Sequence, residues 1–480
     1  MDGLQSITSF SIKGLFRTKT VEISITDNTL IIVGPNGIGK STVANIFYFF
    51  VSRQWGRLLE YRFSEISLVV DNQTITARRD DISGLSDFSR FSSNLRIGSK
   101  TSDLVQKLIE SGEVEAFLSS RKRPSSPPEM ERFAKLLDIP PPEVSRFRIY
   151  LREKIARSED DLFSLPKVEL EKKLASRISS RVLYLPTYRR IEKELKEIFP
   201  DFEERYRDRI IGTDMSPFAR SSVSFIELVS FGMEDVKKRI KTKTEVLRDY
   251  SLSRHNNLSA AYLSDVIHGK ADNYVAQQIN DLTDDQISDI LDRVSEKALP
   301  RNDKELLRSK VKSIQNKNKD EVAVQDKYLA HYFSRLVEVN SEITKKEKDV
   351  RDFVEVCNRY ISPRKQMIYD EITYSAKILD EFGDEIDPSV LSSGEKQVIA
   401  IFSHLYLDDV SSQIVVIDEP ELSLSVPWQK RFLSDIRASG RCEFLIAVTH
   451  SPFIYENELL TNSIDLRKVT KPYSEDQDGR

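Results

Sequence analysis

The fold of this chain is decided by one stretch, Thr29-Leu-Ile-Ile-Val-Gly-Pro-Asn-Gly-Ile-Gly-Lys-Ser-Thr42. A β-branched apolar run enters a glycine-rich loop, and the loop ends in Lys-Ser-Thr just before the apolar residues 43–51. The order is strand, loop, helix, and residues 34–41 fit the spacing Gly-x-x-x-x-Gly-Lys-[Ser/Thr]. Glycines let backbone N–H groups surround phosphate oxygens, and the helix N-terminus adds a favourable dipole. The stretch therefore predicts a nucleoside triphosphate site in an α/β fold.

The loop also predicts which residues contact the nucleotide. These are Gly34, Pro35, Asn36, Gly37, Ile38, Gly39, Lys40, Ser41 and Thr42. We expect Lys40 to neutralise the β- and γ-phosphates and the Ser41 hydroxyl to bind Mg²⁺. The alternative is a glycine turn before a buried helix, but strand and helix both stand where a phosphate loop requires them.

Three further motifs follow in order near the C-terminus. Leu391-Ser-Ser-Gly-Glu-Lys-Gln397 leads into an apolar helical run. Ile414-Val-Val-Ile-Asp-Glu-Pro420 is a predicted buried strand that ends in two carboxylates, and Phe444-Leu-Ile-Ala-Val-Thr-His450 is another that ends in a histidine. With the phosphate loop, these motifs resemble those of the ABC-type ATPases, specifically the soluble SMC, RecF and OLD branch.

The resemblance implies an α/β ABC-ATPase head, a P-loop NTPase with a mixed sheet and helices, that hydrolyses ATP slowly with Mg²⁺. Asp418 is then expected to hold the metal, because hard cations prefer carboxylate oxygen. Glu419 is expected to polarise the attacking water as the general base, and His450 to hydrogen-bond the γ-phosphate. The alternatives are a solvated acidic turn and a structural histidine.

The resemblance gives a role to Ser392, Ser393 and Gly394 as well. In the family, the serine and the N–H groups around the glycine contact the γ-phosphate held by the partner subunit's phosphate loop, at a helix N-terminus. A homodimer or a higher homo-oligomer that sandwiches ATP between its heads is therefore expected. Ser393 stands where many relatives have glycine, and Glu395 where transporters usually have glutamine.

Two features depart from the family pattern. Ser425 occupies the D-loop position where many relatives have histidine, so the D-loop is recognisable but altered. A Q-loop glutamine is not identified, because neither Gln54 nor Gln73 has a diagnostic setting.

The motifs predict a head that is split by a mostly helical insertion. The expected segments are 1–80 (N-terminal half of the head), 81–180 (insertion and loops), 181–200 (a head strand and helix start), 201–362 (helical insertion), 363–470 (C-terminal half of the head) and 471–480 (a polar tail).

Within these segments, the N-terminal half is predicted to contain several strands. Residues 7–32 read as paired strands with turns at Lys13-Gly14 and Asp27-Asn28, and residues 66–78 as a hairpin. Residues 181–190 read as a strand that ends in Arg189 and Arg190. These two arginines are expected either near the nucleotide or a switching interface, or else at a solvated helix start.

The insertion carries the clearest periodicity in the chain. Apolar residues recur at spacings of three and four at Leu329, Tyr332, Leu336, Val339, Ile343, Val350, Phe353, Cys357 and Tyr360. Lys346 is the single polar residue of the series, which Ser362-Pro363 ends. The pattern predicts a helix of roughly 60 Å, at about 1.5 Å per residue. It is either a short coiled-coil-like arm or an amphipathic helix packed on its own domain.

Composition limits the remaining functional classes. No run approaches the ~20 apolar residues of a membrane span, and the first residues lack a secretion signal, so a cytoplasmic protein without membrane partners is expected. The two cysteines predict neither a disulfide framework nor a metal site. A net charge of −4 argues against a generally basic nucleic-acid binder. The basic cluster 237–243 reads as a solvated helix face or as a contact for DNA or an acidic protein.

A narrower resemblance concerns bacterial antiviral ATPases. Phe10-Ser-Ile-Lys-Gly-Leu-Phe-Arg17, Tyr184-Leu-Pro-Thr-Tyr-Arg-Arg190 and Ile417-Asp-Glu-Pro-Glu-Leu-Ser-Leu-Ser425 are similar to the AriA ATPases of PARIS systems, and the PtuA ATPases of Septu systems come next. The resemblance implies anti-phage defence, with a separate effector, a TOPRIM nuclease toxin, held inactive until a phage-encoded trigger protein is sensed. The alternative is a DNA-repair or recombination ATPase of RecF or SMC type that clamps DNA. A transporter motor fits poorly.

Overall fold

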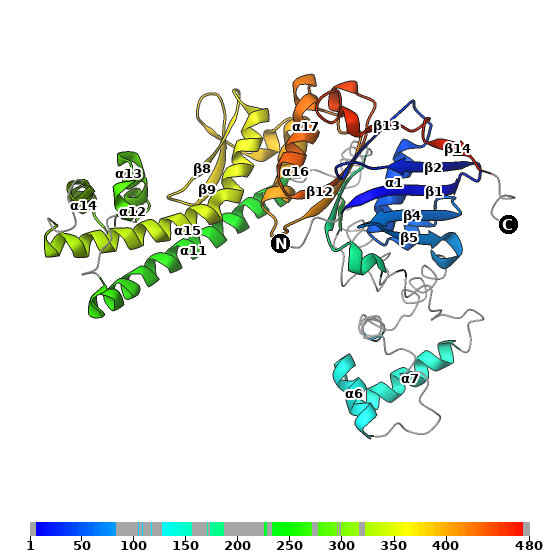
Figure 1. The fold of residues 1–480 in the computed structure, drawn as a ribbon, viewed down its shortest axis with the longest axis horizontal. Coiled ribbons are helices and arrows are strands. Elements are labelled where there is room, and N and C mark those ends of the chain that lie inside the picture. The colour runs from blue at the N-terminus through cyan, green and yellow to red at the C-terminus, as the bar shows by residue number, and fades with distance from the viewer. Residues whose placement is uncertain are drawn as a thin grey trace. The chain divides into compact units, whose positions relative to one another are not determined.

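The computed structural model divides the chain into two compact units, unit 1 (Met1–Ser230 and Val410–Arg480) and unit 2 (Phe231–Asp409). Figure 1 shows the elements of both. The residues described are 6–82, 104, 108, 117, 127–155, 170, 173–186, 225–227, 233–270, 277–294, 296, 299–315 and 322–473. Among them, no helix combines the length and apolar character needed to cross a membrane.

Unit 1 is built on a parallel six-stranded sheet. Its order is β13 (Ser463–Asp465), β3 (Thr29–Val33), β12 (Cys442–Val448), β11 (Gln413–Asp418), β6 (Arg181–Leu185) and β7 (Phe225–Glu227). Every residue of β11 and β12 is buried. Continuous apolar strands of this kind suit the centre of a parallel sheet that is covered on both faces.

A second, antiparallel sheet completes the core of unit 1. Its order is β14 (Thr470–Pro472), β2 (Lys19–Ser24), β1 (Ile7–Leu15), β4 (Glu65–Val70) and β5 (Gln73–Arg78). Helix α1 (Lys40–Val51) joins the two sheets, because Phe47 packs edge-on against Phe10 of β1 and stacks on Phe444 of β12. The α/β head with strands of both kinds, predicted from the sequence, is confirmed.

Unit 1 contains further helices among the residues that the structure describes. Helix α2 (Trp55–Leu58) follows α1, and α17 (Val426–Ala438) packs against β12. Helices α6 (Pro127–Leu137) and α7 (Pro141–Ile155) share a small apolar cluster that includes Phe117 and Phe133.

The strands predicted at the N-terminus are only partly correct. The hairpin of β4 and β5 and the turn at Asp27-Asn28 are confirmed. The turn expected at Lys13-Gly14 is wrong, because β1 runs on to Leu15. Strand β3 also does not pair with β2; its neighbours are β12 and β13 of the parallel sheet.

Gly14 is required by packing and not by a turn. It has a positive φ of 67° where the register of β1 shifts, and a Cβ built there would lie 2.2 Å from the Ser64 Oγ. The chain instead turns at residues 16–18, where Phe16 and Arg17 take φ values of 54° and 68°.

Unit 2 contains a pair of long helices, α11 (Met233–Ile267) and α15 (Val324–Ile361). They run antiparallel, since Lys243 pairs with Asp349 at 3.3 Å while Asp265 bonds to His331 at 3.2 Å. At about 1.5 Å per residue they extend roughly 50–57 Å. The helical insertion with a short coiled-coil-like arm is confirmed, and so is the end of α15 before Ser362.

Shorter elements complete unit 2. Helices α12 (Gln277–Asn280), α13 (Asp284–Asp292) and α14 (Arg301–Gln315) pack on α15, and together with α11 they cover much of its apolar face. A small antiparallel sheet has the order β10 (Glu385–Ile386), β9 (Ser375–Leu379) and β8 (Gln366–Asp370). Helix α16 (Ser393–Tyr406) follows it in the chain.

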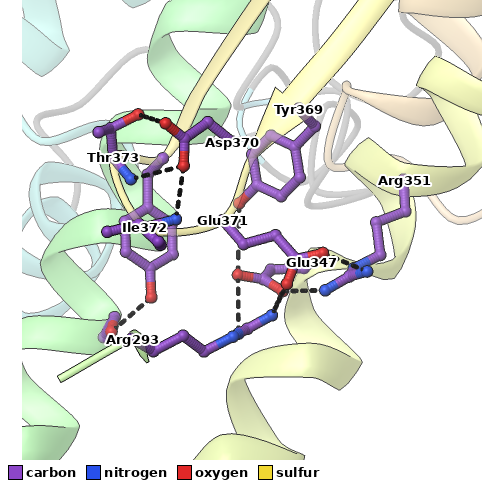
Figure 2. Close-up of polar contacts among 10 residues, drawn as sticks. Arg293, Glu347, Arg351, Tyr369, Asp370, Glu371, Ile372 and Thr373 are labelled. Atoms are coloured by element: carbon purple, nitrogen blue, oxygen red, sulfur yellow. Dashed lines mark hydrogen bonds and ion pairs between the residues drawn. The ribbon is translucent and has the colours of Figure 1, made fainter. Parts of the chain in front are cut away.

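The polar residue inside the α15 seam is not the one predicted. Lys346 is exposed, whereas the neighbouring Glu347 is 0% exposed. Figure 2 shows Glu347 between Arg293 and Arg351, with Glu371 beside both arginines. Arg293 donates to both Glu347 oxygens, at 3.2 and 3.0 Å, so the buried carboxylate is matched by two guanidinium groups.

Several predicted features lie outside the described residues or stay predictions. Arg189, Arg190 and most of the 471–480 tail are not among the described residues. Residues 363–409, predicted to belong to the C-terminal half of the head, lie in unit 2. The residue bounds of the predicted segments therefore remain a prediction.

Candidate functional site

Three predicted motifs meet at one edge of the parallel sheet of unit 1. Strands β3, β12 and β11 are neighbours and run in the same direction, so their carboxyl ends lie side by side. Strand β3 ends at the phosphate loop, β11 at Asp418 and Glu419, and β12 just before His450. The carboxyl ends of parallel strands are the usual place for ligand sites in such sheets.

The phosphate loop has the backbone shape that its glycines predict. Gly37 and Gly39 adopt φ values of 77° and 109°, and a Cβ at Gly37 would meet no other atom within 4 Å. Gly39 precedes the first residue of α1. The loop therefore leaves open space in front of a helix N-terminus, which suits an anionic group.

Lys40 lies folded back over its own loop. It is 4% exposed, and its Nζ donates to the carbonyl oxygens of Gly34 at 2.9 Å and Pro35 at 3.0 Å. Burial lowers the pKa of Lys40, and Asp418, Glu419 and Glu421 oppose that shift by their negative charge. The lysine is therefore placed among the carboxylates at the strand ends.

Ser41 and Asp418 are brought together as the sequence predicts. The Ser41 Oγ donates to the Asp418 Oδ1 at 3.0 Å, and Asp418 is buried. A hydroxyl and a carboxylate are hard oxygen ligands of the kind that Mg²⁺ prefers. These two oxygen ligands beside the phosphate loop fit a nucleotide-bound magnesium ion.

Glu419 is held in an unusual backbone conformation beside Asp418. Its φ is 52°, a left-handed value that is uncommon for a side chain of this size, and its N–H donates to the Val448 carbonyl at 2.8 Å. Burial raises the pKa of Glu419, and so do the charges of Asp418 and Glu421, whereas His450 and Lys40 lower it. His450 itself is exposed.

Glu421 is a residue of this site that the motif analysis passed over. Its carboxylate accepts hydrogen bonds from the Thr449 Oγ1 and from the backbone N–H of His450, each at 2.8 Å. It therefore ties the turn after β11 to the end of β12. The signal in the sequence is a third acid in the run Asp-Glu-Pro-Glu, at positions 418–421.

Comparison with known proteins identifies the family. A family model described as "AAA domain, putative AbiEii toxin, Type IV TA system" matches residues 30–456. The chain belongs to this AAA_21 family. Membership implies an AAA-type ATPase domain that binds a nucleotide with a divalent metal.

Solved structures give weaker likenesses. The Smc head domain with an extended coiled coil from Pyrococcus furiosus, solved bound to the C-terminal domain of ScpA, is 13% identical, with 98% of this chain and 96% of that chain covered and a TM-score of 0.33. The Smc head domain with a coiled coil and joint from Pyrococcus yayanosii is 15% identical, with 98% and 97% covered and a TM-score of 0.29. Among curated proteins, no match was found.

In this AAA_21 ATPase the predicted signature residues belong to unit 2. Ser392 precedes α16 and accepts a hydrogen bond from the Glu395 N–H, while its own N–H donates to the Glu395 carboxylate at 2.6 Å. This reciprocal capping box gives Glu395 a structural role at the start of α16. Ser392 and Ser393 are exposed, whereas Gly394 is buried.

Lys365 holds the same capping glutamate from the side. Its Nζ lies 2.8 Å from the Glu395 Oε2. Burial raises the pKa of Glu395, but the hydrogen bonds from Lys365 and Ser392 outweigh it and lower the pKa overall. The start of α16 is therefore fixed by three groups of unit 2.

The two departures from the family pattern concern the D-loop position Ser425 and the unidentified Q-loop glutamine. Ser425 precedes α17 in extended conformation and makes no side-chain cap. The candidate Q-loop glutamines are both engaged elsewhere, since Gln54 donates to the Ser52 Oγ at 2.9 Å and Gln73 accepts from Arg177 at 2.6 Å. A Q-loop residue is still not identified in this AAA_21 chain.

Phe16 is a second residue at the site that the motifs did not reveal. Its ring lies beside the phosphate loop, 3.3 Å from the position of a Cβ on Gly39, and the residue is 46% exposed. An exposed aromatic face next to a nucleotide loop offers a surface on which a base can stack. A turn with two positive φ values holds this side chain, and sequence periodicity does not reveal such a turn.

Proposed function

We propose that this chain is an ATP-hydrolysing switch whose two copies close on ATP, and whose nucleotide state controls a separate effector during phage infection. The observation that carries the ATPase is the meeting of Lys40, Ser41–Asp418 and Glu419 at adjacent strand ends. AAA_21 membership supports it.

The phosphate loop provides the binding energy for the triphosphate. The N–H groups of residues 37–42 surround the phosphates, and Lys40 exchanges its two carbonyl partners for phosphate oxygens. Ser41 and Asp418 hold magnesium, which when bound supplies positive charge to the β- and γ-phosphates. Phe16 stacks on the base.

Glu419 and His450 act on the γ-phosphate side of the site. Glu419 orients and polarises the attacking water, which requires reach to that water and an ionised carboxylate. His450 hydrogen-bonds the γ-phosphate and responds when it leaves. Glu421 couples the two, because it holds the His450 backbone from the turn that follows Glu419.

The signature residues complete the site of a second copy. Ser392, Ser393 and Gly394 stand at the capped start of α16, where backbone N–H groups favour an anion. Two subunits that each lend this helix start to the other's γ-phosphate form a homodimer with two ATP molecules. Higher oligomers are built from such pairs.

The role in defence rests on the resemblance to the PARIS and Septu ATPases, and on a family description that names a toxin and a toxin–antitoxin system. In this proposal the effector is a nuclease toxin, held inactive by the ATPase and freed when a phage protein is sensed. The protein acts in the cytoplasm.

The ATPase is tested with variants of the two main residues. Lys40→Ala is expected to lose nucleotide binding, and Glu419→Gln to bind ATP, lose turnover and accumulate as dimers in light scattering. Glu22→Gln, on the exposed side of β2, is the matched charge control. A Glu419→Gln protein that hydrolyses ATP at the parental rate would refute the assigned base.

The defence role needs a separate test. The chain is co-expressed with its neighbouring reading frame, and a companion that co-purifies and becomes toxic only after infection supports the proposal. DNA-stimulated hydrolysis without such a companion instead supports the repair ATPase, and it leaves the ATPase assignment intact.

A further inference from the structure

A cavity of about 600 Å³ lies in unit 1 where β1 ends, β4 begins and β5 ends. Its lining, as the structure describes it, includes no residue of the phosphate loop. Five cationic side chains line it, from Lys13, Arg17, Arg62, Arg78 and Arg79.

Three of these cations are already engaged. The Lys13 Nζ lies 2.9 Å from the Glu65 carboxylate, and the Arg78 Nε contacts the same carboxylate at 3.6 Å. Arg79 donates to the backbone oxygens of Leu59 and Tyr61. These contacts build the wall of the cavity.

Arg17 and Arg62 differ from the other three cations. Both are exposed, and among the described residues the structure records no carboxylate or carbonyl partner for either guanidinium. Within the described part of the lining there are two carboxylates, Glu65 and Asp80, against five cations. The cavity therefore has an excess of positive charge, centred on two arginines that are available to a ligand.

The backbone that carries these arginines is fixed. Phe16 and Arg17 both have positive φ, a conformation that costs energy for residues other than glycine and that concentrates at functional sites. The Arg17 N–H donates to the Gly14 carbonyl at 2.9 Å, and the Phe16 N–H donates to the Arg62 carbonyl at 3.0 Å. The two segments that present the free guanidinium groups therefore hold each other.

We propose that this cavity binds the phosphates of a second polyanion, distinct from the ATP held at the phosphate loop. A concave surface with one sign of charge concentrates the opposite charge, and the guanidinium fork matches two phosphate oxygens at once. The phosphates belong either to a nucleic-acid backbone or to a free polyphosphate. The proposal goes beyond the ATPase and does not depend on it.

The test measures binding of two probes to the full chain, with saturating non-hydrolysable ATP analogue present. The probes are a fluorescent single-stranded oligonucleotide and inorganic tripolyphosphate. We expect Arg17→Ser/Arg62→Ser to weaken binding at least tenfold, while Lys430→Ser/Lys471→Ser, with the same charge change elsewhere in unit 1, stays within twofold. For the oligonucleotide, the loss of two phosphate contacts should make the negative slope of log association constant against log salt concentration shallower by about 1.4.

The two arms identify the source of the phosphates. If the oligonucleotide binds and tripolyphosphate does not displace it, the phosphates belong to a nucleic-acid backbone. If tripolyphosphate binds and the oligonucleotide fails to bind, the ligand is a compact polyphosphate. A Lys40→Ala protein is expected to keep this binding. The proposal is wrong if neither probe binds, if Lys40→Ala abolishes binding, or if the arginine pair has no effect in a protein whose thermal unfolding is unchanged.

Discussion

Replacing the buried Glu347 by glutamine should strongly destabilise unit 2. Glu347 is 0% exposed and faces the Arg293 guanidinium, whose side chain is only 5% exposed. Breaking a buried ion pair by removing one partner costs about 3–5 kcal/mol, because a charge is left without compensation. Arg293 keeps Glu371 as a partner, so the lower end of about 3 kcal/mol is expected. For a unit of this size, each kcal/mol of destabilisation lowers the melting temperature by about 2–4 °C, so the unfolding transition of unit 2 should shift down by about 6–12 °C.

The assay is calorimetry of the full chain, with hydrogen exchange along α15 to assign the transition to unit 2. Asp352→Asn is the matched control, since its partner Lys348 is 72% exposed and such pairs contribute at most about 1 kcal/mol. Arg293→Met/Glu347→Leu should recover most of the loss, because Arg351 and Glu371 still neutralise each other. A Glu347→Gln protein as stable as Asp352→Asn refutes the reasoning.

Three other predictions follow from the structure. Phe16→Ala should weaken ATP binding about five- to thirteenfold, the loss of roughly 1–1.5 kcal/mol of stacking, and equilibrium titration that finds Phe16→Ala equal to Phe16→Tyr would exclude a stacking role. Hydrogen bonds from Arg335 and Lys270 hold the pKa of Asp265 well below its usual range. The ionised carboxylate therefore stabilises the fold fully above the pKa of Asp in the unfolded chain, about 4, and this stabilisation is lost as the pH falls below that pKa. Asp265→Asn should flatten the acid side of a plot of melting temperature against pH. Gly14→Ala should destabilise unit 1 by about 1–3 kcal/mol in calorimetry, because its Cβ collides with Ser64.

The arrangement of the candidate nucleotide site could be predicted from the sequence because its determinants are local. A strand, a glycine loop and a helix follow one another within residues 29–51. Asp418 is the last residue of one apolar strand and His450 follows shortly after another, and parallel strands bring such positions to one edge without further information. What the motifs could not show is the contact of Glu421 with the end of β12, which joins residues about 28 positions apart.

The errors arise where a distant segment decides the local structure. Gly14 looks like a turn residue in sequence, yet the constraint on it comes from Ser64 on the way into β4. Lys346 fits a repeat of 3.5 residues, but a helix turns every 3.6 residues and drifts against that repeat. The drift places Glu347 inside, where Arg293 from the segment after α13 supplies the charge that makes its burial tolerable. The local sequence around Gly14 does not reveal Ser64, and that around Glu347 does not reveal Arg293.

The charges at the strand ends give a physical reason for the divalent metal of the proposed mechanism. Lys40 faces three carboxylates, those of Asp418, Glu419 and Glu421, and they oppose the lowering of its pKa. One ammonium among three carboxylates leaves an excess of negative charge, which repels a triphosphate even though the loop geometry suits it. In the proposed mechanism, a divalent cation held by Ser41 and Asp418 would neutralise this excess negative charge where the β- and γ-phosphates bind. The proposed general base Glu419 would thus depend on the metal for the triphosphate to approach it, which would link nucleotide binding to hydrolysis.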